Sequence, residues 1–279
     1  MRHSPVVYTS ADRNHVFANQ GDGHKMAMWV GGKMEEAPHA TMNHNLGGAI
    51  GPAAYLMLNE NGERFMNEDV TGQQMDNQIL RQPGLTAFQF FDSDWQAQFP
   101  VMASGQGTIY GLVDEKDYPG QRFGARGSYA FYDEAERGVK QGTVIKADTL
   151  EELVAKLGLS EQAQNTALRS ICRYNALAEK GHDDDFFKNP RRLFPLAKAP
   201  YYAIRFEPAA IIAAMGGIES DHEAHVLDEN RRVIPGLYVA GNVQGNRFTG
   251  EYPMTIPGLS HSMALTYGRI AGANAAKRI

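Results

Sequence analysis

The end of the chain carries the pattern that most constrains the fold. An apolar run at residues 233–240 is typical of a strand, and it ends at Gly241. A glycine-rich loop follows, and a helix is expected to begin near Gly258 and to continue through Ile270. In α/β folds ligands bind beyond the carboxyl ends of the strands, where a helix N-terminus offers N–H groups and a positive dipole end. This order predicts an α/β fold with a ligand site at the loop.

Other segments have clear start and stop signals. A glycine turn at residues 21–23 opens a short apolar helix, which a glycine pair at residues 31–32 ends. Two apolar runs around an Asn-Gly turn predict a β-hairpin within residues 55–66. Ser160 and Gly181 are the expected cap and stop of a longer helix. Three prolines between positions 190 and 200 mark a shift in composition and the best candidate boundary.

The composition excludes several classes of protein. There are 27 basic and 32 acidic residues, so the chain lacks the basic excess of a nucleic-acid binder. Cys172 is the only cysteine, which excludes a disulfide framework, and its place in an amphipathic helix predicts a buried side chain. No apolar run reaches the roughly 18 residues of a membrane span. Residues 1–5 do not resemble a secretory signal, so we expect a cytoplasmic location for the chain as given.

Residues 215–279 resemble the C-terminal flavin-binding segment of the fumarate reductase and succinate dehydrogenase flavoprotein family. The matching elements and upstream landmarks occur in the family's order: Gly21-Asp22-Gly23, residues 61–68, Arg173-Tyr174-Asn175, Met215-Gly216-Gly217, residues 234–241 and residues 267–272. The resemblance covers nearly the whole chain. It implies a flavin-dependent oxidoreductase that acts on CH–CH groups and uses FAD.

One family landmark is absent from this sequence. Family members begin with a strand and a Gly-x-Gly-x-x-Gly turn that cradles the FAD pyrophosphate, and the sequence contains no such turn. The resemblance therefore implies an incomplete Rossmann-like FAD-binding domain from residues 1–38 and 206–279, with an α+β capping domain at residues 39–205. A truncated gene, an excised fragment and one subunit of a split enzyme are three alternatives. An N-terminal flavoprotein segment or an electron-transfer partner would complete it, and a parent protein with an export signal is compatible with the family.

The resemblance implies an FAD site formed by Asp22, Gly241, Asn242, Gly258, Ser260 and His261. Asn242 stands where relatives often carry Glu. Backbone N–H groups at the helix start would stabilise the anion of reduced flavin. Two simpler interpretations stay open: Asp22 and Asn242 are turn formers, and the helix is a plain capped helix on a sheet.

The substrate side departs from the fumarate reductases. Their proton-donating Arg corresponds to Gly72 here, and their carboxylate-binding His corresponds to Ala213. The place of another clamping Arg falls nearest Met254 or Thr255. A desolvated dicarboxylate needs paired cationic partners, so fumarate and succinate are not the expected substrates.

Three residues are candidates for catalysis. Tyr252-Pro253 resembles a segment of the ketosteroid dehydrogenase branch, in which the Tyr hydroxyl polarises a carbonyl conjugated to the reacting bond; the alternative is a packing aromatic. Arg247 is a candidate anion clamp, with a solvated surface Arg as the alternative. His44 is a candidate general acid, with a structural polar role as the alternative.

The sequence thus predicts reduction of an enoate- or enone-like small molecule other than fumarate, or the reverse dehydrogenation. A 3-ketosteroid-type dehydrogenase is one rival, and an inactive fragment or an assembly or regulatory subunit is another. No metal site is expected. His222 and His225 belong to a surface turn, and residues 183–185 to a solvated helix end.

Overall fold

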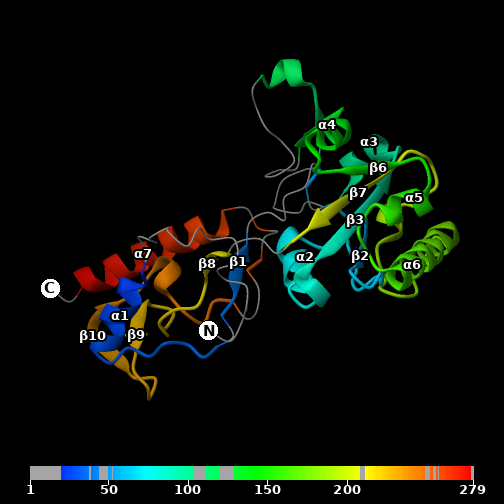
Figure 1. Cartoon of the computed structure of the whole chain (residues 1–279). Helices are drawn as coiled ribbons and strands as arrows, with labels where there is room; N and C mark the ends of the chain where they lie inside the picture. The colour runs from blue at the N-terminus through cyan, green and yellow to red at the C-terminus, as the bar shows by residue number, and fades with distance from the viewer. Residues whose placement is uncertain are drawn as a thin grey trace. The chain divides into compact units, whose positions relative to one another are not determined.

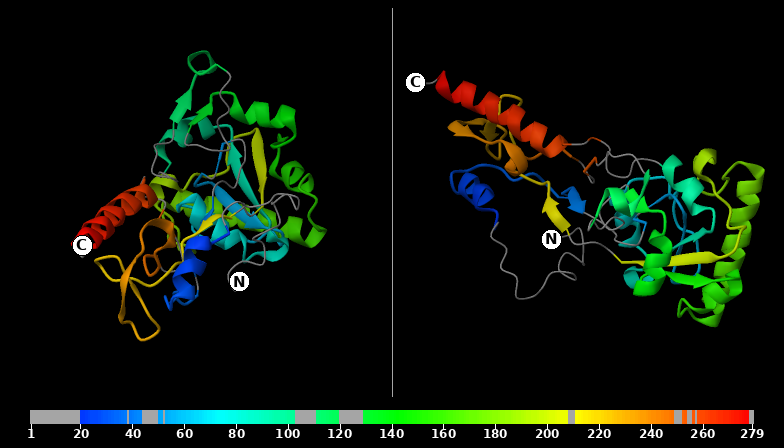
Figure 2. Two further views of the ribbon diagram at one scale, coloured as in Figure 1. Left: turned by 90° about the vertical axis from the view of Figure 1, so that its left-hand side faces the viewer. Right: turned by 90° about the horizontal axis from the view of Figure 1, so that it is seen from above.

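The computed structural model describes residues 20–37, 39–43, 50–51, 53–102, 111–119, 129–207, 211–248, 252–253, 256 and 258–277. The chain divides into two compact units (Figure 1, Figure 2). Unit 1 comprises residues 1–43 and 210–279, and unit 2 comprises residues 44–209. Both units contain helices and strands, which confirms a mixed α and β class. The assignment of residues 1–38 and 206–279 to FAD binding, and of residues 39–205 to a cap, stays a prediction.

Unit 2 is organised around a four-stranded antiparallel sheet. Its strands, in spatial order, are β2 (Leu56–Asn59), β3 (Ala87–Asp92), β7 (Tyr201–Phe206) and β6 (Ile145–Ala147). Phe90 of β3 lies opposite both Leu56 and Ala203. The aromatic residues and Ile204 at positions 201–204 favour a strand, which β7 forms.

Successive residues of the sheet point to opposite faces, and each face has its own core. Leu56, Phe88 and Phe90 pack with the helices α5 (Leu150–Ala155) and α6 (Glu161–Lys180). Figure 1 shows α6 beside the sheet. The opposite face, which includes Met57, Phe91 and Tyr202, packs with α2 (Gly72–Ile79) and with the aromatic rings of Trp95 and Phe99. Gly72, the position expected to correspond to the Arg of fumarate reductases, is a buried residue in the first turn of α2.

The remaining described elements of unit 2 are short: η1 (Pro83–Leu85), α3 (Trp95–Gln98), η2 (Phe99–Val101), β4 (Gly111–Val113), η3 (Glu115–Asp117), β5 (Tyr129–Phe131), α4 (Glu134–Gln141) and η4 (Pro190–Arg192). Strands β4 and β5 pair in parallel as a separate two-stranded sheet.

The bounds of α6 follow its sequence signals. The Ser160 hydroxyl accepts the N–H of Ala163 at 3.2 Å, and Gly181 ends the helix with a φ of +71°. Cys172, however, is exposed, so the expectation of a buried thiol was wrong. The buried stripe of α6 runs through Ile171 and Tyr174, and Cys172 lies one residue outside it.

The predicted hairpin at residues 55–66 is only partly formed. The first strand of the hairpin, β2, is present. Among the described residues the second half of the hairpin forms only an isolated bridge, between Arg64 and Leu58 of β2. Asn59 Oδ1 accepts the N–H groups of Asn61 and Glu63, which tightens the turn. Strand β2 forms its ladder with β3 instead, and the paired residues are 28 to 34 positions apart in sequence.

A buried ion network follows this turn. Arg64 contacts Glu68 at 2.9 Å and Asp183 at 2.7 Å, and the Lys188 ammonium contacts Glu68 at 3.2 Å. The side chains of Glu68, Asp183 and Lys188 are all 0% exposed. The expectation that residues 183–185 form a solvated face was therefore wrong for Asp183, because Arg64 neutralises its carboxylate inside the unit.

The described part of unit 1 consists of small sheets, two α-helices and a short 3-10 helix. Its elements are α1 (Asp22–Trp29), β1 (Thr41–Asn43), β8 (Ile211–Ala214), β9 (His225–Leu227), β10 (Val233–Tyr238), η5 (Gly241–Val243) and α7 (Leu259–Ala276). Strand β1 pairs with β8, and β9 pairs with β10, both antiparallel. The run at residues 233–240 was expected to be a strand of an α/β fold, and in the described part of the chain β10 belongs to a two-stranded hairpin.

Two small apolar clusters hold unit 1 together. One contains the buried residues Ala27, Ile218, Val226 and Val239, and the other contains Ala40, Met215 and Tyr252. Helix α7 contributes no buried residue, although it is 18 residues long. No helix within the described ranges has both the length and the apolar character needed to cross a membrane.

Candidate functional site

The glycine loop and the start of α7 bring several of the predicted residues together. Gly241 opens η5 with a φ of +78°, and Gly258 precedes α7 with a φ of +71°. Both values lie in the left-handed region that favours glycine. The Ser260 hydroxyl donates to Asn242 Oδ1 at 2.9 Å, which ties the start of α7 to the end of the loop after β10. Two predicted cofactor residues are thus direct neighbours.

Tyr252 is a buried aromatic that also caps α7. Its side chain is 7% exposed, and its ring meets that of Phe248 edge-on at 5.2 Å. Its hydroxyl oxygen accepts the N–H of Ser260 at 2.9 Å. The packing interpretation is thereby supported. The hydroxyl still has its own proton to donate, because the contact with Ser260 uses only an oxygen lone pair.

The same contact changes the expectation for the helix N-terminus. The N–H of Ser260 was predicted to be available to a flavin, but Tyr252 already accepts it. The loop folds back so that a residue eight positions earlier reaches the first turn of α7. The dipole of α7 remains as a feature that suits an anionic group, and a Cβ at Gly258 would meet no described atom within 4 Å.

Arg247 has a partly unsatisfied guanidinium. Its Nε donates to the carbonyl of Gln244 at 3.0 Å, and its Cζ lies 5.7 Å from the ring centroid of Phe248. Both terminal nitrogens are shielded from solvent, and neither has an acceptor among the described residues. Desolvation lowers the pKa of Arg247, while Tyr267 and Glu35 act in the opposite direction. Arg247 is therefore not a solvated surface residue.

Glu35 fixes the loop that carries Arg247, and sequence reasoning did not find it. Glu35 is 7% exposed, and one of its oxygens lies 3.1 Å from His39 Nδ1. Its other oxygen accepts the N–H of Asn246. Asn246 has a φ of +58°, a conformation that needs support in a residue other than glycine. No local pattern marks Glu35, because Asn246 lies 211 positions further along the chain.

Gly245 of the loop is required by close backbone packing. A Cβ at Gly245 would lie 2.8 Å from Glu35 Oε2 and would overlap the backbone of Gly217. The chain is held there by backbone bonds from Ile218 N to Val243 O at 2.8 Å and from Gly245 N to Ile218 O at 2.7 Å. The Met215-Gly216-Gly217 motif therefore forms part of the wall that supports Arg247.

Other predicted residues are not brought to this loop. The Asp22 side chain is 74% exposed and pairs with Lys25 at 3.2 Å, and His261 is exposed on α7. His44, Met254 and Thr255 lie outside the described residues. Ala213 belongs to β8 and pairs with Met42 of β1.

Comparisons with known proteins identify the family. A family model described as an FAD binding domain matches residues 6–255. The chain belongs to the FAD-binding domain family. This confirms the resemblance to the fumarate reductase flavoproteins and to the ketosteroid dehydrogenase branch, and FAD is the cofactor of the family.

Two curated relatives and one solved structure show the range of the family. NADH:acrylate oxidoreductase of Vibrio harveyi is 33% identical over 228 residues, covering 81% of this chain and 19% of that protein. Fumarate reductase (cytochrome) of Shewanella frigidimarina is 28% identical over 266 residues, covering 92% of this chain and 39% of that protein. The structure of 3-ketosteroid-delta4-(5alpha)-dehydrogenase from Rhodococcus jostii RHA1 matches with a TM-score of 0.68 at 21% identity, covering 98% of this chain and 49% of that chain. The last likeness concerns the fold alone.

The chain spans less than half the length of these three proteins. The positive end of α7 would suit an anionic or electron-rich part of FAD, the cofactor of the family. The Gly-x-Gly-x-x-Gly turn that binds the pyrophosphate in the family has no counterpart in the sequence.

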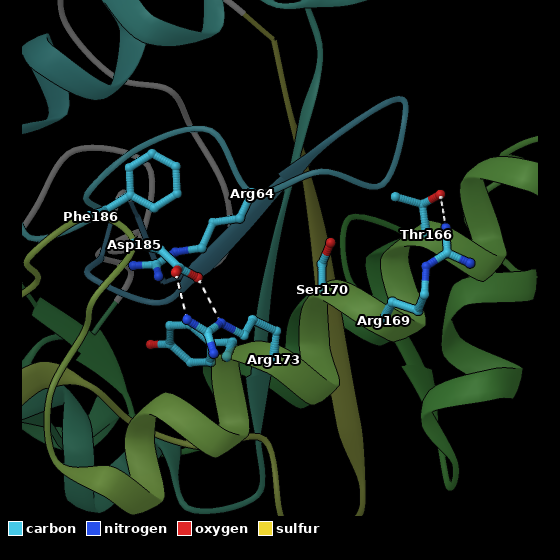
Figure 3. A pocket seen from close by; sticks show the side chains of 8 residues that line it. Arg64, Thr166, Arg169, Ser170, Arg173, Asp185 and Phe186 are labelled. Atoms are coloured by element: carbon cyan, nitrogen blue, oxygen red, sulfur yellow. Dashed lines mark hydrogen bonds and ion pairs between the residues drawn. The ribbon is translucent and has the colours of Figure 1, made fainter.

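A pocket lies on unit 2, and none of the predicted site residues lines it. Figure 3 shows this pocket of about 470 Å³ on α6, lined by three arginines. Arg64 is bound to Glu68 and Asp183, and Arg173 binds Asp185 at 2.8 Å. Because two of the three guanidinium groups are already neutralised, we assign no ligand to this pocket.

One group of potential metal ligands occurs in the part of the chain that the structure describes. Donor atoms of Asp221, Glu223 and His225 lie within 4.8 Å of one another. Asp221 Oδ1 accepts the N–H groups of Glu223 and His225, and its other oxygen lies 2.9 Å from His225 Nδ1. The turn itself explains these contacts, and the prediction of no metal site stays untested.

Proposed function

We propose that the chain is the substrate-binding part of an FAD-dependent oxidoreductase that reduces a C=C bond conjugated to a carboxylate or carbonyl group. One observation carries the proposal: the desolvated, unpaired nitrogens of Arg247 lie in the same loop as the buried Tyr252, whose hydroxyl proton has no acceptor among the described residues. A cation that binds the carboxylate and a hydrogen-bond donor to the carbonyl oxygen are the two groups that activate such an alkene for reduction.

The residues have separate roles in this proposal. FAD, when bound, supplies the hydride that is added to the β carbon. Arg247 binds the anionic end of an enoate through two N–H donors, a geometry that matches a carboxylate. Tyr252 donates its O–H to the carbonyl oxygen as negative charge develops there, and the dipole of α7 favours the same charge. His44 remains the predicted proton donor to the α carbon.

Fumarate is a poor match for this site. The resemblance implies that Gly72 and Ala213 stand at the cationic and histidine positions that fumarate reductases use. In the described part of the loop, Arg247 is the cation that is left without an acidic partner. One relative, NADH:acrylate oxidoreductase, takes its name from acrylate, which is a monocarboxylate.

A 3-ketosteroid-type dehydrogenase is the second candidate. Tyr252 favours it, because a buried phenol that donates to a carbonyl suits an enone as well as an enoate. The same groups serve both directions of the reaction. An inactive fragment or an assembly subunit is the remaining alternative, and it predicts no flavin binding. The proposal includes an N-terminal FAD-binding segment, supplied in the same chain or by a partner.

The test begins with flavin titration of the purified chain, alone and with a relative's N-terminal segment. A flavin-loaded sample is then assayed with a reduced dye and a panel of acrylate-type acids, enones and ketosteroids, and with an oxidising dye for the reverse direction. We expect reduction of a mono-acid or enone and no turnover of fumarate. Arg247→Met should abolish activity on acids and spare neutral enones. Turnover of fumarate, or no flavin binding in either sample, would contradict the proposal.

A further inference from the structure

The carboxylate of Glu35 has no role in the proposed chemistry, although it is buried beside the loop that carries Arg247. Its two oxygens are used by His39 and by the N–H of Asn246. Its charge also acts on the guanidinium of Arg247, which follows Asn246 directly. Glu35 and Arg247 do not form an ion pair within 4.0 Å, so the guanidinium keeps its terminal nitrogens for another acceptor.

This arrangement of charges limits the net charge of a ligand that can bind at Arg247. Arg247 contributes one positive charge and Glu35 one negative charge in surroundings largely shielded from water. A monocarboxylate would bring the local sum to one negative charge, and a dicarboxylate to two. The other described cations of unit 1 that have ion pairs are engaged elsewhere: Lys25 with Asp22, Lys33 and Arg231 with Glu219, and Arg232 with Asp228.

We propose that Glu35 is a specificity-determining residue, whose buried negative charge restricts the Arg247 site to ligands with a single negative charge. The inference rests on the proposed function, because it names the substrate class of the same site. Coulomb repulsion between like charges several ångströms apart is strong enough at a partly desolvated site to change affinity by about tenfold. Glu35 also positions the loop, since it accepts the N–H of Asn246.

The experiment compares two ligands of nearly equal shape that differ by one charge: fumarate and its monomethyl ester. Affinities are measured by calorimetry with excess FAD at about pH 8, where imidazole groups are generally neutral. The variants are Glu35→Gln, which removes the charge and keeps an acceptor for Asn246, and Glu36→Gln as the matched control on an exposed neighbour. Arg247→Met removes the site.

We expect the wild type to prefer the monoester by at least about tenfold, and Glu35→Gln to reduce this preference to about threefold or less by strengthening fumarate binding. Glu36→Gln should leave the preference unchanged, and Arg247→Met should abolish binding of both ligands. An unchanged preference in Glu35→Gln, or binding of neither ligand by the wild type, would overturn the inference.

A further variant covers the case in which Glu35→Gln does not fold. Glu35→Asp keeps the charge, so it should keep the preference for the monoester even if the loop shifts. If Glu35→Asp loses the preference, loop geometry and not charge is responsible, and the inference is wrong. Failure of the inference can be distinguished from failure of the proposed function. Flavin binding with turnover of neutral enones alone would support the oxidoreductase and contradict the role of Glu35. Charge selectivity without flavin binding would support the role of Glu35 and contradict the oxidoreductase.

Discussion

The Tyr252 hydroxyl accepts a hydrogen bond from Ser260 and still has its proton to donate. Substitution of this residue is therefore the most direct single-residue test of the proposed site. Tyr252→Phe removes the acceptor of the Ser260 N–H and should cost about 1 kcal/mol of unfolding free energy. It should also reduce turnover by about a hundredfold, because an oxyanion donor is lost. Urea denaturation and steady-state rates measure the two effects. Tyr132→Phe, at an exposed tyrosine, is the control. Full activity in Tyr252→Phe would reduce this side chain to a packing role.

Asp183 should make the stability of unit 2 depend on acidity. Burial by itself would raise the pKa of Asp183, but hydrogen bonds from Arg64 and from the N–H of Lys188 outweigh it and hold the pKa at about 2, below the ordinary value of 3.8. A carboxyl with a lowered pKa stabilises the fold above the unfolded pKa, and this contribution is lost as the pH falls through the folded pKa. We therefore expect a loss of about 2 kcal/mol between about pH 4 and pH 2.

Asp183→Asn isolates this contribution. The variant should be destabilised at neutral pH, where it leaves Arg64 short of a counter-charge, and its stability should fall less steeply below about pH 4. Denaturation followed by Tyr and Trp fluorescence at a series of pH values gives both slopes. Asp184→Asn, whose carboxylate pairs with Lys180 at the surface, is the control. Parallel slopes for wild type and Asp183→Asn would show that other carboxyls dominate acid unfolding.

At the scale of elements, a small substitution in the turn after β2 should strongly reduce the stability of unit 2. Gly62 has a φ of +79°, and a Cβ there would lie 2.5 Å from the Ala167 N and would overlap the Ala163 carbonyl of α6. Gly142, which ends α4, has a similar φ of +74° but open space around it. Both Gly→Ala changes incur the left-handed penalty of about 1 kcal/mol, and Gly62→Ala adds about 1–3 kcal/mol of overpacking.

Thermal and urea unfolding of Gly62→Ala and Gly142→Ala compare the two contributions directly. The difference between the two variants should exceed about 1 kcal/mol, because backbone strain is common to both and only the contact with α6 differs. Equal losses would mean that α6 can move away from the turn without cost.

The same elements show what the sequence could predict and why. Ser160 and Gly181 gave the bounds of α6, because a cap and a left-handed stop act within one turn of the residues they serve. The loop at residues 241–260 was located for the same reason. Glu35 and Asp183 could not be predicted as partners, since their contacts come from Asn246 and Arg64, 211 and 119 positions away. Long-range polar pairs leave no periodic signal in one sequence.

At the scale of the whole molecule, the two units differ in how they are stabilised. Unit 2 has two cores, one on each face of its sheet. Among the described residues, unit 1 has two clusters of four and three buried residues, and its longest described helix buries none. Hydrophobic stabilisation scales with the apolar area removed from water, so we expect unit 1 to be the less stable of the two units. The unit that contains the proposed cofactor residues is thus the one that depends most on what it binds.

This difference predicts where FAD should act. A ligand that binds the folded state stabilises it by about 2.7 kcal/mol at a concentration a hundredfold above its Kd. Because the proposed site lies within unit 1, FAD should slow amide hydrogen exchange in α7 and in the β9–β10 hairpin, and should leave α6 and β3 unchanged. Hydrogen exchange followed by mass spectrometry, with and without saturating FAD, measures the protection of the unit 1 elements and of the unit 2 elements in the same experiment. Arg247→Met should leave this protection intact, because the proposal assigns its guanidinium to the substrate and not to the flavin. Protection confined to α6 and β3 would place the flavin outside unit 1 and remove the basis of the proposed site.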